Sequence, residues 1–186
     1  SGDTVQAERM LIAAGRRVDL DAIGAGALGV DTAADSLPVD GHLRVTERVW
    51  AVGDVTGSGA FTHVATNQAR IVAHDILGHT CPPFAAHAVP RVTFTDPEVA
   101  GVGMSEHDAR SAGLEVTVAR AAVPESARGW IHGPGNAGFV EVVVDRSTDT
   151  LVGATVVGPH AGEVIGLLTL AVHDRLGVET MRSMIY

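Results

Sequence analysis

Cysteine is nearly absent, since Cys81 is the only one among 186 residues. A single thiol can form neither an internal disulfide nor a cysteine-based metal cluster within one chain. In the run Thr80-Cys81-Pro82-Pro83 no flanking Lys or Arg favours a thiolate. We therefore interpret Cys81 as a loop thiol without chemistry of its own.

Long apolar runs and basic stripes are also missing. No apolar run reaches the ~20 residues that span a bilayer, and no basic and apolar leader opens the sequence. Basic residues number 13 against 22 acidic ones, giving a net charge of −9, and the arginines are scattered. This composition predicts no nucleic-acid partner and no membrane partner, and the cytoplasm is the expected location.

Histidine is plentiful, with nine residues, but the pattern does not favour a metal site. No HExxH run occurs, and His74 and His79 lie on either side of Gly78. The overall composition, 46% hydrophobic and 19% charged, is typical of a chain that folds around a core.

Prolines 82, 83 and 90 bracket a segment that suits neither a helix nor the inside of a sheet, which predicts a domain boundary there. Apolar spacing predicts helices at 62–77, 105–112 and 163–175, the second with Ser105 as its cap. β-branched and apolar runs predict strands at 9–15, within 41–51, and at 92–95, 116–122, 139–144 and 151–157. Residues 19–39 are expected to form a loop with at most one short helix.

Two glycine-rich stretches compete as ligand sites. Gly24-Ala-Gly26-Ala-Leu-Gly29 matches the G-x-G-x-x-G pattern, whose backbone can hold a pyrophosphate where a strand meets a helix. Polar aspartates precede it and Pro38 follows soon after, so neither the strand nor the long helix is expected. We interpret this stretch as a surface loop.

The second stretch, Val49-Trp-Ala-Val-Gly53-Asp54-Val-Thr-Gly57, places a carboxylate where an apolar strand enters a glycine-rich turn. A carboxylate there can accept hydrogen bonds from sugar-alcohol hydroxyls, and Gly53 lets a ligand approach the backbone. An aspartate that only stabilises the turn explains the motif equally well.

The continuation through Phe61-Thr62-His63-Val-Ala65 gives Asp54 a context, because the motifs together resemble the flavoprotein disulfide reductase family, which includes dihydrolipoamide dehydrogenase and mercuric reductase. The resemblance implies that Asp54 binds the ribityl chain of FAD. It also implies that Phe61, Thr62, His63 and Ala65 line the isoalloxazine ring. A helix N-terminus there would stabilise negative charge on the reduced flavin.

Further motifs extend the resemblance over nearly the whole chain. Leu11 to Arg17 is similar to the crossover out of the family's nicotinamide-binding domain, where Gly15 would lie close to NAD(P). Pro90 to Gly103 is similar to the opening of its interface domain. The implied domains are the end of a nicotinamide-binding domain (1–17), the C-terminal segment of an FAD-binding domain (18–83) and a dimerisation domain (84–186), expected to be truncated at its C-terminus.

The fold implied is α+β: an antiparallel sheet with helices on one side, preceded by the C-terminal part of an FAD/NAD(P)-binding α/β domain. The implied function is that of a fragment of a homodimeric flavoprotein, using FAD and NAD(P)H, that passes electrons to a disulfide, a metal ion or another acceptor. No catalytic residue is identified in this stretch, and the fragment alone is expected to be inactive. The alternative is a non-catalytic dimerisation module that binds no cofactor on its own.

Overall fold

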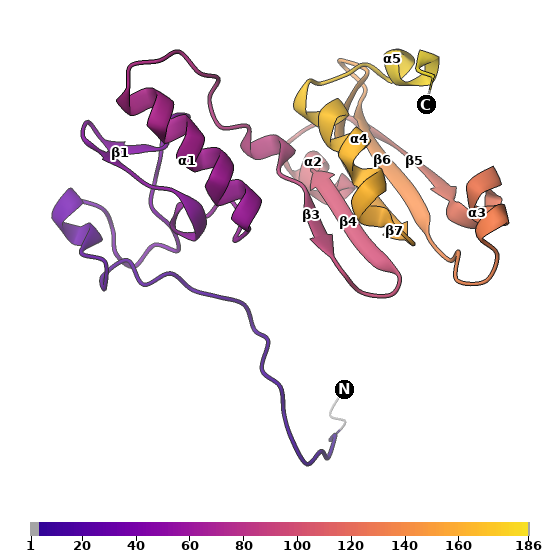
Figure 1. Cartoon of the computed structure of the whole chain (residues 1–186), viewed down its shortest axis with the longest axis horizontal. Coiled ribbons are helices and arrows are strands. Elements are labelled where there is room, and N and C mark those ends of the chain that lie inside the picture. Colours follow the sequence, from indigo (N-terminus) through magenta and orange to yellow (C-terminus); the bar gives the residue numbers. More distant parts are fainter. Residues whose placement is uncertain (1–3, 186) are drawn as a thin grey trace. The chain divides into compact units, whose positions relative to one another are not determined.

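A computed structural model describes residues 4–185, and the chain divides between Phe84 and Ala85 into two compact units. The first unit is mostly irregular and contains one long helix (Figure 1). Its elements are η1 (Ala25–Leu28), β1 (Arg44–Thr46), β2 (Val49–Trp50), η2 (Gly53–Thr56) and α1 (Thr62–Ile76). Strands β1 and β2 form an antiparallel hairpin. A small core of Leu20, Ala25, Leu37 and Ala51 holds the irregular segments together.

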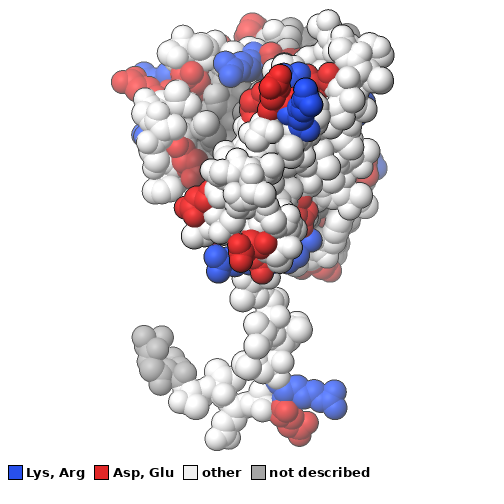
Figure 2. Space-filling view, turned by 90° about the vertical axis from the view of Figure 1, so that its left-hand side faces the viewer, with Lys and Arg blue, Asp and Glu red and all other residues white. Residues whose placement is uncertain are grey.

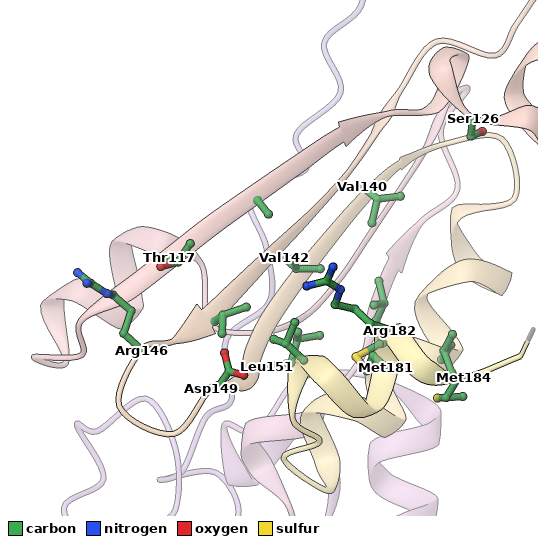
Figure 3. A pocket seen from close by; sticks show the side chains of 15 residues that line it. Thr117, Ser126, Val140, Val142, Arg146, Asp149, Leu151, Met181, Arg182 and Met184 are labelled. Carbon is green, nitrogen blue, oxygen red and sulfur yellow. The ribbon is translucent and has the colours of Figure 1, made fainter.

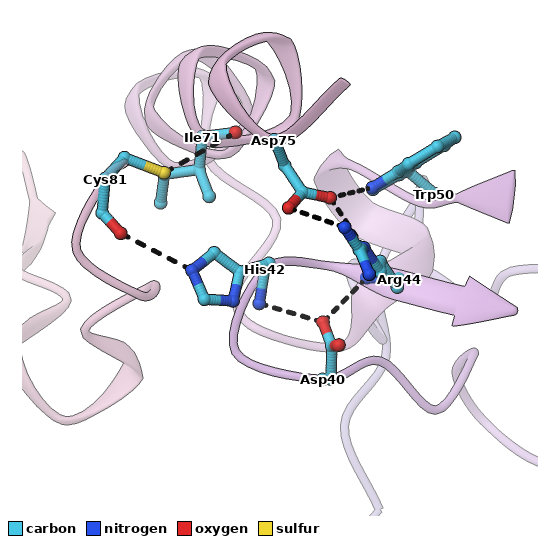
Figure 4. A network of polar contacts seen from close by, with 7 residues as sticks. All are labelled: Asp40, His42, Arg44, Trp50, Ile71, Asp75 and Cys81. Atoms are coloured by element: carbon cyan, nitrogen blue, oxygen red, sulfur yellow. Dashed lines mark hydrogen bonds and ion pairs between the residues drawn. The ribbon is translucent and has the colours of Figure 1, made fainter. Parts of the chain in front are cut away.

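One carboxylate joins α1 to the hairpin (Figure 4). Asp75 near the end of α1 accepts hydrogen bonds from Arg44 Nε at 2.6 Å, from Arg44 Nη2 at 2.9 Å and from Trp50 Nε1 at 2.7 Å. The Arg44 hydrogen bonds, and then that of Trp50, hold the pKa of Asp75 below its ordinary value. The contact ties the C-terminal end of α1 to the hairpin.

The second unit is a five-stranded antiparallel sheet with short helices between its strands (Figure 1). The order across the sheet is β3-β4-β7-β6-β5, so the last strand in sequence lies at the centre. The elements are η3 (Ala86–Ala88), β3 (Arg91–Thr93), β4 (Glu98–Gly103), α2 (Glu106–Ser111), β5 (Val116–Ala122), η4 (Val123–Glu125), α3 (Ala127–His132), β6 (Phe139–Asp145), β7 (Thr150–Gly158), α4 (Ala161–His173) and α5 (Val178–Ser183).

Helix α4 supplies much of the core of this unit. Its buried residues Ile165, Leu168 and Val172 pack with small and branched side chains of β4 and β7. At its start, the Gly162 N–H donates to Glu98 Oε2 at 2.9 Å, so a side chain from β4 satisfies a backbone group that has no partner within the helix.

Most of the predicted elements are confirmed. Helix α1 lies within the predicted 62–77, β5 spans the predicted 116–122, and α2 begins after Ser105 with the expected capping box to Asp108. The G-x-G-x-x-G stretch forms only the short η1, between Gly24 and Gly29 in left-handed conformations.

The predicted strand at 9–15 is wrong. These residues have no regular structure, and Met10, Leu11 and Ile12 are exposed. A strand is held by hydrogen bonds to a neighbouring strand, and residues 4–84 of the structure place none beside this segment. Strand β4 and helices α3 and α5 were not predicted; β4 is rich in glycine, and each of the two helices has only six residues.

Candidate functional site

Asp54 lies in a tight turn directly after β2. The turn is the 3-10 helix η2, in which Gly53 has a φ of 81° and the closing Gly57 has a φ of 68°. A left-handed conformation is easily adopted only by glycine, which explains both residues. Gly53 is buried, whereas 44% of the Asp54 side chain is exposed. The turn therefore keeps its backbone inside and presents a carboxylate at the surface.

A closed ring of hydrogen bonds holds this turn from within. The Gly53 N–H donates to Gln68 Oε1 at 2.7 Å, and Gln68 Nε2 donates to Thr56 Oγ1 at 3.0 Å. Thr56 Oγ1 in turn donates to the Gly53 carbonyl at 2.8 Å. Gln68 is completely buried on α1, so the ring satisfies an amide that would otherwise be costly to bury.

The Asp54 carboxylate faces one cation. Arg16 Nη1 lies 3.1 Å from Asp54 Oδ2, and Arg16 Nη2 donates to the Ala60 carbonyl at 2.6 Å. Both charged side chains are substantially exposed, so this ion pair contributes little to stability. It does place residue 16, and with it the neighbouring Gly15, at the chain segment around Asp54. Gly15 has a φ of 93° and is exposed.

The other predicted flavin residues lie at the start of α1. Phe61 is the N-cap residue, and its ring stacks on that of His63 with centroids 5.3 Å apart. Thr62 and His63 are exposed in the first turn. Ala65 faces the turn, because a Cβ added to Gly53 would lie 3.5 Å from the Ala65 Cβ.

The chemistry of this region fits a flavin. A carboxylate accepts hydrogen bonds from hydroxyls, a glycine turn admits a close ligand, and the first turn of a fifteen-residue helix favours negative charge. Sequence reasoning identified the turn and the helix start, but it missed Arg16, Thr56 and Gln68. The sequence does contain a signal for Gln68. It lies four residues after Val64 and three before Ile71, so helical spacing puts it on the buried face of α1, where an apolar residue is expected.

The second unit carries an apolar groove with a volume of about 910 Å³ (Figure 3). Val140 and Val142 of β6 lie on the sheet side, and Met181 and Arg182 of α5 line it from the helix side. Leu167 of α4 lines the groove and exposes 38% of its surface, and Val164 and Leu170 on the same helix expose 44% and 51%. Monomers rarely leave such contiguous apolar surface uncovered.

Charges are interspersed on the surface shown in Figure 2, where arginines lie among acidic residues without forming a continuous basic patch. Within residues 4–185, no group of three or more His, Cys, Asp or Glu side chains is placed to hold a metal ion. The described helices include none that is both long and apolar enough to cross a bilayer.

Comparison with known proteins assigns both units. Residues 1–69 match the family described as pyridine nucleotide-disulphide oxidoreductase, and residues 89–186 match the dimerisation domain of the same family. The dihydrolipoyl dehydrogenase of Chlamydia trachomatis is 35% identical over 179 residues, which cover 95% of this chain and 38% of that protein. The enzyme of the same name from Halobacterium salinarum is 34% identical over 183 residues, covering 97% and 38%. The chain thus spans well under half the length of these relatives.

Solved structures agree. LpdA of Mycobacterium tuberculosis superposes with a TM-score of 0.73 and 28% identity, over 82% of this chain and 33% of LpdA. The HOCl-induced flavoprotein disulfide reductase RclA of Escherichia coli also gives a TM-score of 0.73, with 26% identity, over 94% of this chain and 40% of RclA. The family is FAD- and NAD(P)-dependent. By sequence and by fold, this chain belongs to the pyridine nucleotide-disulphide oxidoreductase family and contains its dimerisation domain.

Proposed function

We propose that this chain supplies the ribityl-binding carboxylate and the dimer contact of an enzyme that passes electrons from NAD(P)H through FAD to an acceptor. Among a disulfide, a metal ion and other acceptors, a thiol-disulfide couple is favoured, because the relatives are dihydrolipoyl dehydrogenases. With such a couple the electrons can also run in the opposite direction, from a dithiol through FAD to NAD(P)+. The chain has a single cysteine, so the redox-active cysteine pair of such a reaction does not lie within these 186 residues.

The observation that carries the proposal is the exposed Asp54 carboxylate beside the start of α1. In this proposal Asp54 holds the ribityl hydroxyls, with Gly53 allowing the close approach. Phe61, Thr62, His63 and Ala65 lie along the isoalloxazine ring, and Gly15 lies near the nicotinamide nucleotide. FAD would supply the hydride-accepting chemistry, and these residues would bind and orient it. Residues 1–17, 18–83 and 84–186 then belong to the nicotinamide, flavin and dimerisation domains.

Titration with FAD tests the flavin role. We expect saturable quenching of flavin fluorescence by the purified chain. Asp54→Ala should weaken binding by about 10- to 100-fold, the effect of losing one hydrogen bond to a charged acceptor. Asp35→Ala is the matched control, because Asp35 is an exposed aspartate of the same unit. If the chain does not bind FAD, or if Asp54→Ala binds as well as the original, the proposed flavin role is wrong.

A dimerisation module is the second candidate, and the apolar stripe on α4 favours it. Val164, Leu167 and Leu170 recur every three residues, so they lie along one side of the helix, within the matched dimerisation domain. We propose that a second copy of the chain covers this stripe. This role can hold together with flavin binding, or alone if FAD does not bind.

Light scattering at micromolar concentration tests the dimer. The expected mass is twice the 19.2 kDa of the chain. Leu170→Asp places a charge in the stripe and should shift the protein to a monomer. Ile131→Asp, at an exposed position on α3 outside the stripe, should leave the dimer unchanged. A monomeric original chain, or a Leu170→Asp variant that still dimerises, would contradict the assignment of the surface.

A further inference from the structure

Gln68 stands out because it is a fully buried polar side chain whose hydrogen bonds all serve one short turn. It lies on α1 between Val64 and Ile71, which are also buried. An apolar side chain of similar size would be easier to bury at this position, but it would leave the buried Gly53 N–H without the acceptor that Gln68 provides. The amide therefore calls for an explanation other than packing.

The explanation lies in what the ring of hydrogen bonds controls. Gln68 Oε1 accepts a hydrogen bond from the Gly53 N–H at 2.7 Å. Gln68 Nε2 donates to Thr56 Oγ1 at 3.0 Å, and Thr56 Oγ1 donates to the Gly53 carbonyl. Both backbone polar groups of Gly53 are thereby fixed, in a residue whose φ of 81° is left-handed. Glycine has more conformational freedom than other residues, so it is the residue at which a turn most needs such a restraint.

The next residue along the chain is Asp54. The conformation of Gly53 determines where the Asp54 backbone enters the turn, which closes with a hydrogen bond from the Gly57 N–H to the Asp54 carbonyl. The described contact of the Asp54 carboxylate is the ion pair to the exposed Arg16. A ligand that hydrogen-bonds to this carboxylate needs it prearranged, because ordering a mobile group on binding costs affinity.

We propose that Gln68 is a positioning residue for flavin binding: from inside the unit, together with Thr56, it holds the Gly53 peptide so that the Asp54 carboxylate stays at the surface in its ligand-binding direction. This inference rests on the proposed flavin role of Asp54. It adds a residue that does not touch the ligand and acts through the backbone.

The experiment compares four single variants, and the double variant that combines Gln68→Met with Asp54→Asn, by amide hydrogen exchange and by FAD titration. Gln68→Met keeps the volume and removes the hydrogen bonds, and Asn67→Met makes the same kind of change at the exposed neighbouring position. Gln68→Glu retains an acceptor for the Gly53 N–H and, because burial favours the neutral carboxyl group, also a donor for Thr56, so it serves as the conservative rescue. Asp54→Asn removes the charge that the ring is proposed to position.

Without ligand, Gln68→Met should speed exchange of the Gly53 amide by about tenfold or more, while Asn67→Met leaves it unchanged and Gln68→Glu keeps most of the protection. With FAD, Gln68→Met should weaken binding by about tenfold, and Gln68→Glu by much less. In the Asp54→Asn background the effect of Gln68→Met on FAD affinity should largely disappear, because the two residues are proposed to act together. A general destabilisation of the unit would instead weaken FAD binding equally in both backgrounds.

The outcomes separate the two proposals. Unchanged exchange at Gly53 in Gln68→Met, or equal losses of FAD affinity in the presence and absence of the Asp54 charge, would overturn the positioning role. If Asp54→Asn has no effect on FAD affinity, or FAD does not bind at all, the proposed function fails and the positioning role for flavin fails with it. The exchange data would then still decide whether Gln68 fixes the turn.

Discussion

Two leucines two positions apart on α4 allow the packing of the second unit to be tested with a matched pair. Leu168 is 7% exposed and belongs to the core against β4 and β7, whereas Leu170 is 51% exposed. Truncating a buried leucine to alanine costs about 2–5 kcal/mol, which combines lost transfer free energy with the cavity left behind. Leu168 also lines the groove, so the vacated space can open to solvent, and we expect a cost in the lower half of that range.

For Leu170→Ala the expected cost is smaller. A fully buried leucine contributes about 1.5–3 kcal/mol, and only about half of Leu170 is covered within one chain, which gives roughly 1 kcal/mol. If Leu170 also contacts a second copy, its cost should grow with protein concentration, because dimerisation adds to the stability of the folded state by mass action. The cost of Leu168→Ala should not show this growth.

Urea unfolding followed by far-UV circular dichroism measures both variants, at several protein concentrations, through the midpoint and the slope of the transition. The packing is supported if both variants keep the slope of the original protein while Leu168→Ala has a clearly lower urea midpoint than Leu170→Ala. Equal destabilisation by Leu168→Ala and Leu170→Ala at every concentration would refute the reasoning, since it would mean that the two side chains are equally buried.

Asp75 and Ser105 each hold one helix of the fold through side-chain hydrogen bonds. Because hydrogen bonds from Arg44 and Trp50 lower the pKa of Asp75 in the folded state, its contribution to stability is present above the unfolded pKa and is lost as the pH falls through the lowered value. Asp75→Asn should therefore flatten the acid limb of the stability curve of the first unit, measured by Trp50 fluorescence in a Trp130→Phe background; an unchanged acid limb would contradict this. Ser105→Ala removes the cap of α2 and should cost about 1 kcal/mol in urea unfolding, and no loss would mean that the capping box is dispensable.

The sequence predicts correctly those helices and strands whose pattern is contained within their own residues. Helix α1 has helical apolar spacing and a glycine just beyond it, and β5 is a run of β-branched and small residues between turns. The run at 9–15 is equally apolar, yet a strand needs a neighbour, and this requirement cannot be read from the run itself. Helices α3 and α5 have fewer than two full turns, too few for a period to be visible.

In the candidate site, too, contiguous motifs are predicted from the sequence and contacts between distant residues are not. The Gly53-Asp54 turn and the start of α1 are identified from contiguous residues, and their proposed roles come from the resemblance to a family. The Gln68 ring joins residues 12 and 15 positions apart, and the Arg16 contact to Ala60 spans 44. Such contacts depend on how segments pack, and a pattern within one segment does not contain that information.

The central place of β7 has a consequence for the order in which the second unit can form. β3 pairs with β4, and β5 pairs with β6, but only β7 pairs with both of these strand pairs. Until Thr150–Gly158 has been synthesised, a growing chain can therefore form at most two separate strand pairs of this sheet, each marginal alone and each with unpaired edges. A ribosome paused before that strand would expose an aggregation-prone intermediate, and chaperone dependence should be greatest in that interval.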